Sequence, residues 1–186
     1  MKVLCLIDLQ ADFIDGALWT QESKEIVPKI VDKINNYSDK SNTLVLYTKD
    51  THYSDYLDTL EGDMLPIPHC IENTPGWSIN KDIKRAVKSN RFLSYSSNKI
   101  INSRVYKNTF GADDLREFFI KFKDEIESIE FVGLCTDICV ISNVLMARQA
   151  LPDVQIYVDK NCCAGTTTDK HQAALEVMKS CQINII

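Results

Sequence analysis

Hydrophobic and polar positions change their spacing repeatedly along the chain. Short apolar runs, rich in β-branched residues, predict strands that are buried on both faces. Longer segments with apolar residues three or four positions apart predict amphipathic helices. Strands are predicted at 3–7, 43–48, 103–107, 127–132, 154–158 and 182–186. Helices are predicted at 24–38, 113–124, 137–149 and 168–180, and a helix or turn at 80–88.

The alternation of strands and helices predicts the fold class. Such an order is typical of a three-layer α/β/α sandwich around a mostly parallel, Rossmann-like sheet, here of six strands. The length of 186 residues fits one domain, so we expect a single domain over 1–186. Residues 49–79 interrupt the alternation, because they are rich in Pro, Gly, Asp and Thr and show no period. We expect a long functional loop there. For helix 113–124 we expect Asp113 or a neighbouring residue to be the N-cap.

The charge balance excludes some classes of partner. The net charge is −5, the pI is near 5.2, and Lys and Arg are scattered, whereas nucleic-acid binding needs a basic face. No apolar stretch approaches the roughly 18 residues of a membrane span. Asp8 interrupts the apolar start at 3–7, which is too short for a signal peptide. We therefore expect a cytoplasmic protein with a small-molecule substrate. The oligomeric state stays open, with a homo-oligomer among the options.

Seven cysteines raise the question of disulfides. Their odd number, the size of the chain and the lack of a secretion signal favour reduced thiols instead. Most of them are expected to be small buried residues. The cysteines are Cys5, Cys70, Cys135, Cys139, Cys162, Cys163 and Cys181.

Cys139 is the candidate nucleophile among these thiols. It lies in the first turn of the helix predicted after strand 127–132. The N-terminus of a helix favours thiolate over thiol, and its free N–H groups can stabilise an oxyanion. Position alone fits a core cysteine facing the sheet equally well. Cys135 lies four residues upstream, but this C-x-x-x-C spacing is not that of the thioredoxin-like C-x-x-C sites.

A reactive thiol needs a proton acceptor, and Asp8 is the candidate. A charge at the end of an apolar strand is rarely left without a partner. The alternative is a structural Asp that caps a loop or bonds to Gln10. Lys107 follows another short strand and can pair with Asp8, although a lone lysine there is more often a surface residue. His171 lies in the predicted helix 168–180 and is interpreted as surface or structural.

The irregular loop contains two of the three histidines and several carboxylates. Asp50 and His52 are two positions apart just after a strand, so both side chains can reach one ion. Glu61 and His69 follow in the same loop. Such a set suits Zn²⁺, Fe²⁺ or Mn²⁺. The alternative is that His69 only packs the loop.

Three of these features follow predicted strands. Asp8 follows the first strand, Asp50 the second, and the segment from Cys135 to Cys139 the strand at 127–132. Ligands of parallel sheets bind beyond the carboxyl ends of the strands. We therefore expect these features to meet in one crevice.

Together these features resemble the isochorismatase-like cysteine hydrolases, and within them the nicotinamidase branch. The matching segments run in the family's order across nearly the whole chain. They are Asp8-Leu9-Gln10-Ala11-Asp12-Phe13, Lys49-Asp50-Thr51-His52, Pro68-His69-Cys70-Ile71 with Thr74-Pro75-Gly76-Trp77, Lys107 with Phe110-Gly111, and Gly133 to Val140. The first and last segments are specific in combination, whereas any one alone would be weak.

The resemblance implies a catalytic triad of Asp8, Lys107 and Cys139. Asp8 would take the proton of the thiol, and Lys107 would stabilise the charged pair. A cis peptide is expected before Cys135, which directs the N–H groups of Cys135 and Cys139 to the oxyanion. The implied reaction converts nicotinamide to nicotinate and ammonia through a cysteine thioester, a step of NAD salvage.

The resemblance also implies metal ligation by Asp50, His52 and His69. Glu61 resembles the extra acidic ligand of some family members. One divalent ion is expected as cofactor, with zinc favoured and iron or manganese as alternatives.

Phe13 resembles the aromatic residue that packs against a planar substrate ring. A second aromatic wall often precedes the last metal-binding histidine in this family, but the segment 65–67 holds Leu, Pro and Ile here. Trp77 or Tyr106 is the expected substitute, so both are candidate substrate-binding residues.

Other functions stay open at this point. A related C–N hydrolase would act on a carbamoyl or ureido group, but a small linear amide leaves the histidines of the loop unexplained. Vinyl-ether hydrolysis of isochorismate needs neither the cysteine nor metal ligands. A non-catalytic thiol or binding module on the same fold is the alternative from a different class. A dinucleotide-binding module is disfavoured, because no Gly-x-Gly-x-x-Gly follows the first strand.

Overall fold

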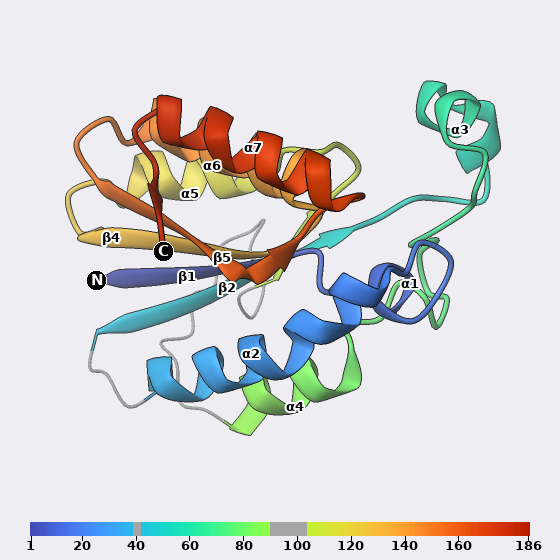
Figure 1. Ribbon diagram of the computed structural model, residues 1–186, viewed down its shortest axis with the longest axis horizontal. Coiled ribbons are helices and arrows are strands. Elements are labelled where there is room, and N and C mark those ends of the chain that lie inside the picture. Colours follow the sequence, from blue (N-terminus) through green and yellow to red (C-terminus); the bar gives the residue numbers. More distant parts are fainter. Residues whose placement is uncertain (39–41, 90–103) are drawn as a thin grey trace.

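The protein is built around one parallel sheet (Figure 1). The computed structural model describes residues 1–38, 42–89 and 104–186. Its six strands are ordered β3-β2-β1-β4-β5-β6, and all neighbours pair in parallel. The strands are β1 (Lys2–Ile7), β2 (Thr43–Asp50), β3 (Arg104–Lys107), β4 (Ser128–Leu134), β5 (Gln155–Ala164) and β6 (Asn184–Ile185).

Helices cover both faces of the sheet (Figure 1). α2 (Gln21–Ser38) and α4 (Lys81–Ser89) lie on one face. α5 (Asp113–Lys121), α6 (Ile141–Ala150) and α7 (Thr168–Ser180) lie on the other. The predicted three-layer α/β/α sandwich is therefore confirmed. Shorter elements are α1 (Ala11–Ile14), the 3₁₀ turn η1 (Tyr56–Asp58), α3 (Leu60–Met64) and the π-type turn η2 (Thr136–Val140).

The middle strand β1 shows why the sequence folds in layers. Val3 and Ile7 pack into the core beneath α5, α6 and α7, whereas Leu4 and Leu6 pack into the core against α2. Side chains alternate between the two faces of a strand, so an uninterrupted apolar run fills both cores. Each such burial contributes about 1.5–3 kcal/mol. None of the helices in the described ranges is long and apolar enough to cross a membrane.

Several predicted boundaries differ from the structure. Helix α2 begins earlier than predicted because Thr20 and Ser23 exchange hydrogen bonds: each hydroxyl oxygen accepts from the other residue's N–H at 3.0 Å. Helix α5 ends at Lys121, and its N-cap is the residue next to Asp113 rather than Asp113 itself. Ala112 occupies the N-cap and caps nothing with its side chain, while Asp113 lies in the first turn, where a negative charge is favourable. Of the strand predicted at 103–107, residue 103 lies outside the described residues.

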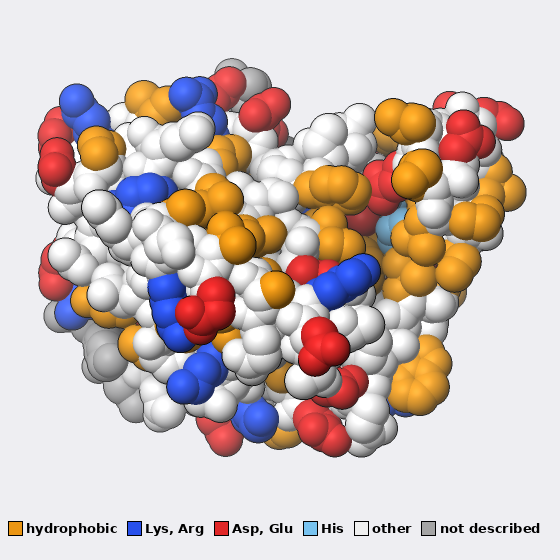
Figure 2. All heavy atoms as spheres, turned by 45° about the horizontal axis from the view of Figure 1, so that its top comes forward, with side chains coloured by type: hydrophobic (Ala, Val, Ile, Leu, Met, Phe, Trp, Pro, Cys, Tyr) orange, Lys and Arg blue, Asp and Glu red, His pale blue; other side chains and the backbone are white. Residues whose placement is uncertain are grey.

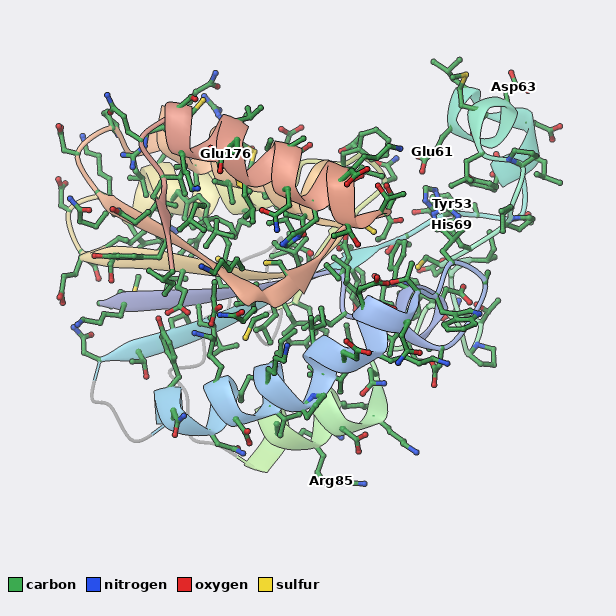
Figure 3. All side chains as sticks on the ribbon, in the orientation of Figure 1. Tyr53, Glu61, Asp63, His69, Arg85 and Glu176 are labelled. Atoms are coloured by element: carbon green, nitrogen blue, oxygen red, sulfur yellow. The ribbon has the colours of Figure 1, made fainter. Side chains whose placement is uncertain are left out.

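The long loop predicted at 49–79 is less irregular than expected. Strand β2 continues to Asp50, and the loop then contains η1 and α3. Figure 1 shows α3 projecting beyond the carboxyl ends of the strands. Figure 2 shows a hollow between this projection and the rest of the molecule, with acidic and histidine side chains in it. Figure 3 shows that Glu61 and His69 extend from this loop toward the body. The loop thus presents polar side chains at the carboxyl ends of the strands.

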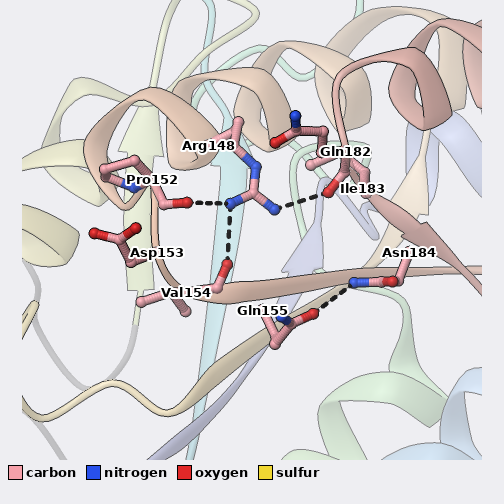
Figure 4. Close-up of a pocket in the computed structure, with 8 residues that line it drawn as sticks. All are labelled: Arg148, Pro152, Asp153, Val154, Gln155, Gln182, Ile183 and Asn184. Carbon is pink, nitrogen blue, oxygen red and sulfur yellow. Dashed lines mark hydrogen bonds between the residues drawn. The ribbon is translucent and has the colours of Figure 1, made fainter.

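Arg148 closes the opposite end of the molecule (Figure 4). Its Nη1 donates to the carbonyls of Pro152 at 3.0 Å and Val154 at 3.1 Å. Its Nη2 donates to the carbonyl of Gln182 at 2.9 Å. The guanidinium therefore ties the turn after α6 to the turn after α7, and it lines the hollow between these turns.

Arg148→Met is expected to lower the free energy of unfolding by about 1–2 kcal/mol, since hydrogen bonds from one charged donor to several backbone carbonyls are lost. Urea denaturation followed by circular dichroism measures the change. Arg116→Met on the exposed side of α5 is the control and should change stability by less than about 0.5 kcal/mol. Equal stability of the Arg148 variant and the control would contradict the role of Arg148.

Candidate active site and metal centre

Three distant segments converge at the carboxyl end of the sheet. The Nζ of Lys107, the last residue of β3, lies 2.7 Å from Oδ2 of Asp8 and 3.5 Å from Sγ of Cys139. All three residues are buried, with exposed fractions of 0% for Asp8 and 6% for the other two. They meet because their strands lie close together in the sheet order β3-β2-β1-β4. Lys107 ends β3, Asp8 follows β1, and Cys139 lies in η2, which follows β4.

Thr48 holds the Asp8 carboxylate in place. The Thr48 hydroxyl donates to Oδ1 of Asp8 at 2.6 Å, and its oxygen accepts from the Asp8 N–H at 3.0 Å. The alternative in which Asp8 bonds to Gln10 is not what the structure contains, because the Gln10 side chain bonds to Asp50 and Trp77 instead. The role of Thr48 was not predicted from the sequence. Its place near the end of the strand next to β1 would have indicated a partner for Asp8.

Burial dominates the electrostatics of this trio. It raises the pKa of the Cys139 thiol well above its ordinary value, and the Asp8 carboxylate raises it further, while Lys107 opposes both. Burial also raises the pKa of Asp8, against the attraction of Lys107. Burial disfavours the charged form of Lys107, but Asp8, Cys139 and Asp50 together keep its pKa raised. Desolvation thus opposes the shift toward thiolate that a helix start favours.

The backbone around Cys139 forms a tight turn rather than a regular helix start. The Leu134–Cys135 peptide is cis, which confirms the cis bond expected there. The Cys135 carbonyl accepts from the N–H groups of Ile138 and Val140, both at 3.0 Å. This turn is anchored from α7, because Nδ1 of His171 lies 2.8 Å from the hydroxyl of Thr136.

A second cluster of polar side chains lies beside the thiol. The Nε2 atoms of His52 and His69 face Oδ2 of Asp50 at 3.0 and 3.5 Å. Oε1 of Glu61 lies 3.7 Å from Nε2 of His52 and 3.9 Å from Nε2 of His69. Asp50 and the two histidines are buried, whereas Glu61 is partly exposed. The loop histidines thus do more than pack the loop.

These donors fit a divalent ion. A tetrahedral ion with bonds of about 2.0–2.2 Å holds its ligand atoms about 3.3–3.6 Å apart, close to the separations of Asp50 Oδ2 from the two imidazole nitrogens. Glu61 lies outside the compact group that Asp50, His52 and His69 form. Nδ1 of His69 lies 2.9 Å from the Ile67 carbonyl, and donation to that oxygen leaves Nε2 free to bind an ion. Two imidazoles with two carboxylates suit Zn²⁺, Fe²⁺ or Mn²⁺.

Asp50 belongs to both clusters. While Oδ2 faces the histidines, Oδ1 lies 3.2 Å from Nζ of Lys107. The Gln10 amide fixes the Asp50 backbone, donating to its carbonyl at 2.8 Å and accepting from its N–H at 2.7 Å. Hydrogen bonding to the histidines, together with the Lys107 charge, holds the pKa of Asp50 well below its usual range despite burial. This carboxylate therefore stays ionised.

The aromatic candidates divide into two groups. The Phe13 ring packs edge-on against the His69 ring, with centroids 5.6 Å apart, so it lies beside the histidine cluster. Trp77 and Tyr106 stack on each other at 5.8 Å. Because strand side chains alternate, Tyr106 points to the face of β3 opposite Lys107. A substrate-binding role for Trp77 and Tyr106 stays a prediction, and their placement gives it no support.

His69→Ala is expected to lower the metal content of the purified protein from about one ion per chain to less than about 0.1, since removing one of two imidazoles leaves too few strong ligands. Elemental analysis by plasma mass spectrometry after dialysis measures it. The third histidine supplies the control, because His171→Ala leaves the cluster intact and should keep the ion. Equal metal content in both variants would contradict the assignment.

Comparison with known proteins places this geometry in context. A family model described as the isochorismatase domain matches residues 2–186. Among solved structures, a nicotinamidase/pyrazinamidase from Bacillus subtilis is similar at 25% identity with a TM-score of 0.80, over 99% of this chain and 98% of that chain. No curated protein matches the sequence at a significant level.

Two further structures share the fold. A pyrazinamidase from Pyrococcus horikoshii, solved in complex with zinc, is 24% identical with a TM-score of 0.74, over 100% of this chain and 98% of that chain. An N-carbamoylsarcosine amidase from Thermoplasma acidophilum is 18% identical with a TM-score of 0.73, over 99% of this chain and 94% of that chain.

Proposed function

Because the chain belongs to the isochorismatase family, we propose that it is a cysteine hydrolase of small amides and that its substrate is nicotinamide. One observation carries the proposal. The Cys139 thiol contacts the Lys107 ammonium, which is paired with the Asp8 carboxylate and lies beside a buried group of side chains that could hold a metal ion. A nucleophile, a proton acceptor and a site that can orient a ring are therefore within reach of one substrate.

The first half of the proposed mechanism is acylation. Asp8 takes the proton of the Cys139 thiol as Sγ attacks the carbonyl carbon of the amide. The charge that develops on the carbonyl oxygen is stabilised by the backbone N–H groups of Cys135 and Cys139, and the loss of one such donor typically costs about 3–4 kcal/mol of barrier. Asp8 then returns the proton to the leaving nitrogen, the C–N bond breaks, and ammonia departs. A thioester on Cys139 remains.

The second half is hydrolysis of that thioester. Asp8 accepts a proton from water, the water oxygen adds to the thioester carbon, and the C–S bond breaks. The carboxylic acid leaves, and the proton on Asp8 returns to the sulfur. Lys107 keeps its proton throughout, because its ammonium balances whichever of Asp8 and Cys139 is negative. This role explains why a cation is buried between two groups that exchange a proton.

The ring of the substrate is proposed to bind between Phe13 and the histidine cluster. A divalent ion held by Asp50, His52, His69 and Glu61 would supply a Lewis-acid anchor for a ring nitrogen. The Phe13 ring, which already packs against His69, would cover one face of the heterocycle. Orientation of this kind places the amide carbon beside Sγ, where proximity alone is worth several kcal/mol.

Ammonia release from nicotinamide tests the proposal. We expect activity that falls at least about tenfold after treatment with a chelator and returns when Zn²⁺ is added. N-carbamoylsarcosine serves as the comparison substrate. Turnover of that compound without turnover of nicotinamide would contradict the ring amide and favour the ureido alternative. Release of ammonia from neither compound by the metal-loaded protein would favour a non-catalytic module.

A further inference from the structure

A second hollow, separate from the thiol, lies on the face of the sheet that α4 covers. It has a volume of about 320 Å³ and lies between the sheet and α4. Its floor is apolar and includes Leu6, Leu9 and Ile83. Trp77 forms part of its wall. Small-molecule sites combine this size and an apolar lining with a few polar groups that give specificity.

Lys49 is the buried charged group in this hollow, and within the described part of the chain it has no counterion. Only 6% of the residue is exposed. Its Nζ lies 2.8 Å from the centroid of the Trp77 ring and 5.7 Å from that of Tyr106. Among the described residues, no carboxylate lies within ion-pair distance of it. Buried lysines are normally paired, and a ring face returns only about 2 kcal/mol of the lost hydration.

The other charged side chains around this hollow have the same sign. Lys84, Lys88 and Arg104 also line it. Lys84 and Arg104 are close enough to repel the Lys49 ammonium, and Glu72, which does not line the hollow, is close enough to attract it. No acidic side chain lines the hollow within the described residues. A protein with a net charge of −5 therefore gathers four cations around one apolar cavity. Such a field attracts small anions.

We propose that this hollow binds a small aromatic carboxylate, with the carboxylate paired to Lys49 and the ring on the apolar floor. The buried ammonium supplies the charge that an anion needs, and the floor removes an apolar ring from water. Phosphate would satisfy the same cations but would leave the floor uncovered. The site is distinct from the thiol, because Lys49 lines this hollow, whereas the next residue of β2, Asp50, faces Lys107 and the histidines.

The indole resonance of Trp77 gives a direct readout in the zinc-loaded protein. The chain has two tryptophans, and Trp19→Phe assigns their two indole N–H signals. Benzoate is the probe, with benzyl alcohol as a neutral ring and inorganic phosphate as an anion without a ring. We expect benzoate to shift the Trp77 signal with a dissociation constant of about 1 mM and to leave Trp19 unmoved. Benzyl alcohol and phosphate should bind at least about tenfold more weakly.

Lys49→Met is the decisive variant, and it is expected to weaken benzoate binding at least about tenfold. Removal of an unpaired buried charge does not endanger the fold. Lys24→Met is the matched control, because Lys24 also lies over a tryptophan, 3.9 Å from the Trp19 ring centroid, and it should bind benzoate as the wild type does. Unchanged affinity in Lys49→Met, or equal affinity for phosphate and benzoate, would overturn the proposal. Ammonia release by Lys49→Met is measured in parallel, so a failure of this site is distinguished from a failure of the proposed reaction.

Discussion

Cys139→Ala is expected to lower kcat/KM for ammonia release from nicotinamide by at least about 10⁴-fold. The reason is that, among the described residues, Cys139 has the one thiol with a hydrogen bond from the Lys107 ammonium, which is itself paired with Asp8. A water molecule cannot replace the sulfur, because the proposed mechanism requires a covalent thioester. Ammonia release measured with a coupled glutamate dehydrogenase assay gives the rate, and the variant should keep its thermal unfolding temperature within a few degrees.

Cys163→Ala is the matched control for this variant. Cys163 is also buried, at 4% exposed, and packs in the same hydrophobic core, but it lies outside the catalytic trio. It should lose a little stability and keep its activity within about threefold. Retained activity in Cys139→Ala, or equal loss in both variants, would remove the basis of the thioester mechanism.

Lys107→Met is expected to affect both stability and catalysis. Lys107 lies between the carboxylates of Asp8 and Asp50, at 2.7 and 3.2 Å. Its removal leaves two buried negative groups without their cation, which should lower the free energy of unfolding by about 3–5 kcal/mol. The proton of the thiol would then pass to an acceptor with no positive neighbour, so we expect kcat/KM to fall at least about 10³-fold. Urea denaturation and the ammonia assay measure the two effects.

An exposed ion pair provides the comparison for Lys107. Lys179 and Glu176 on α7 are 2.6 Å apart, and both side chains are more than half exposed. Lys179→Met should therefore change stability by less than about 1 kcal/mol and leave activity unchanged. If the two lysine variants had equal stability, the buried cation would not hold the site together.

The convergence of Asp8, Lys107 and Cys139 is predictable from the sequence because topology determines it. The apolar runs predict parallel strands, and the carboxyl ends of parallel strands all lie at the same end of the sheet. Residues that follow different strands are then neighbours, whatever their separation along the chain. The same argument predicts that Asp50 and His52 lie at that edge.

Other features depend on contacts that a local pattern does not contain. Strand β5 continues to Ala164 through the polar residues Asp159 and Lys160. The Lys160 N–H donates to the Ile186 carbonyl, and the last residues of β5 pair with β4 again after a shift in register. The raised pKa of Cys139 follows first from burial, which position at a helix start does not reveal. The placement of Trp77 beside Lys49 depends on the path of a loop.

Asp50 divides its two carboxylate oxygens between the two clusters, and this limits how the family's chemistry can diverge in this chain. An asparagine in its place would present one oxygen and one NH₂, so either the ammonium or the imidazoles would face a donor instead of an acceptor. No uncharged side chain at this position would offer an acceptor to the ammonium and to the imidazoles at once. Loss of the Asp50 carboxylate is therefore expected to disturb both clusters together.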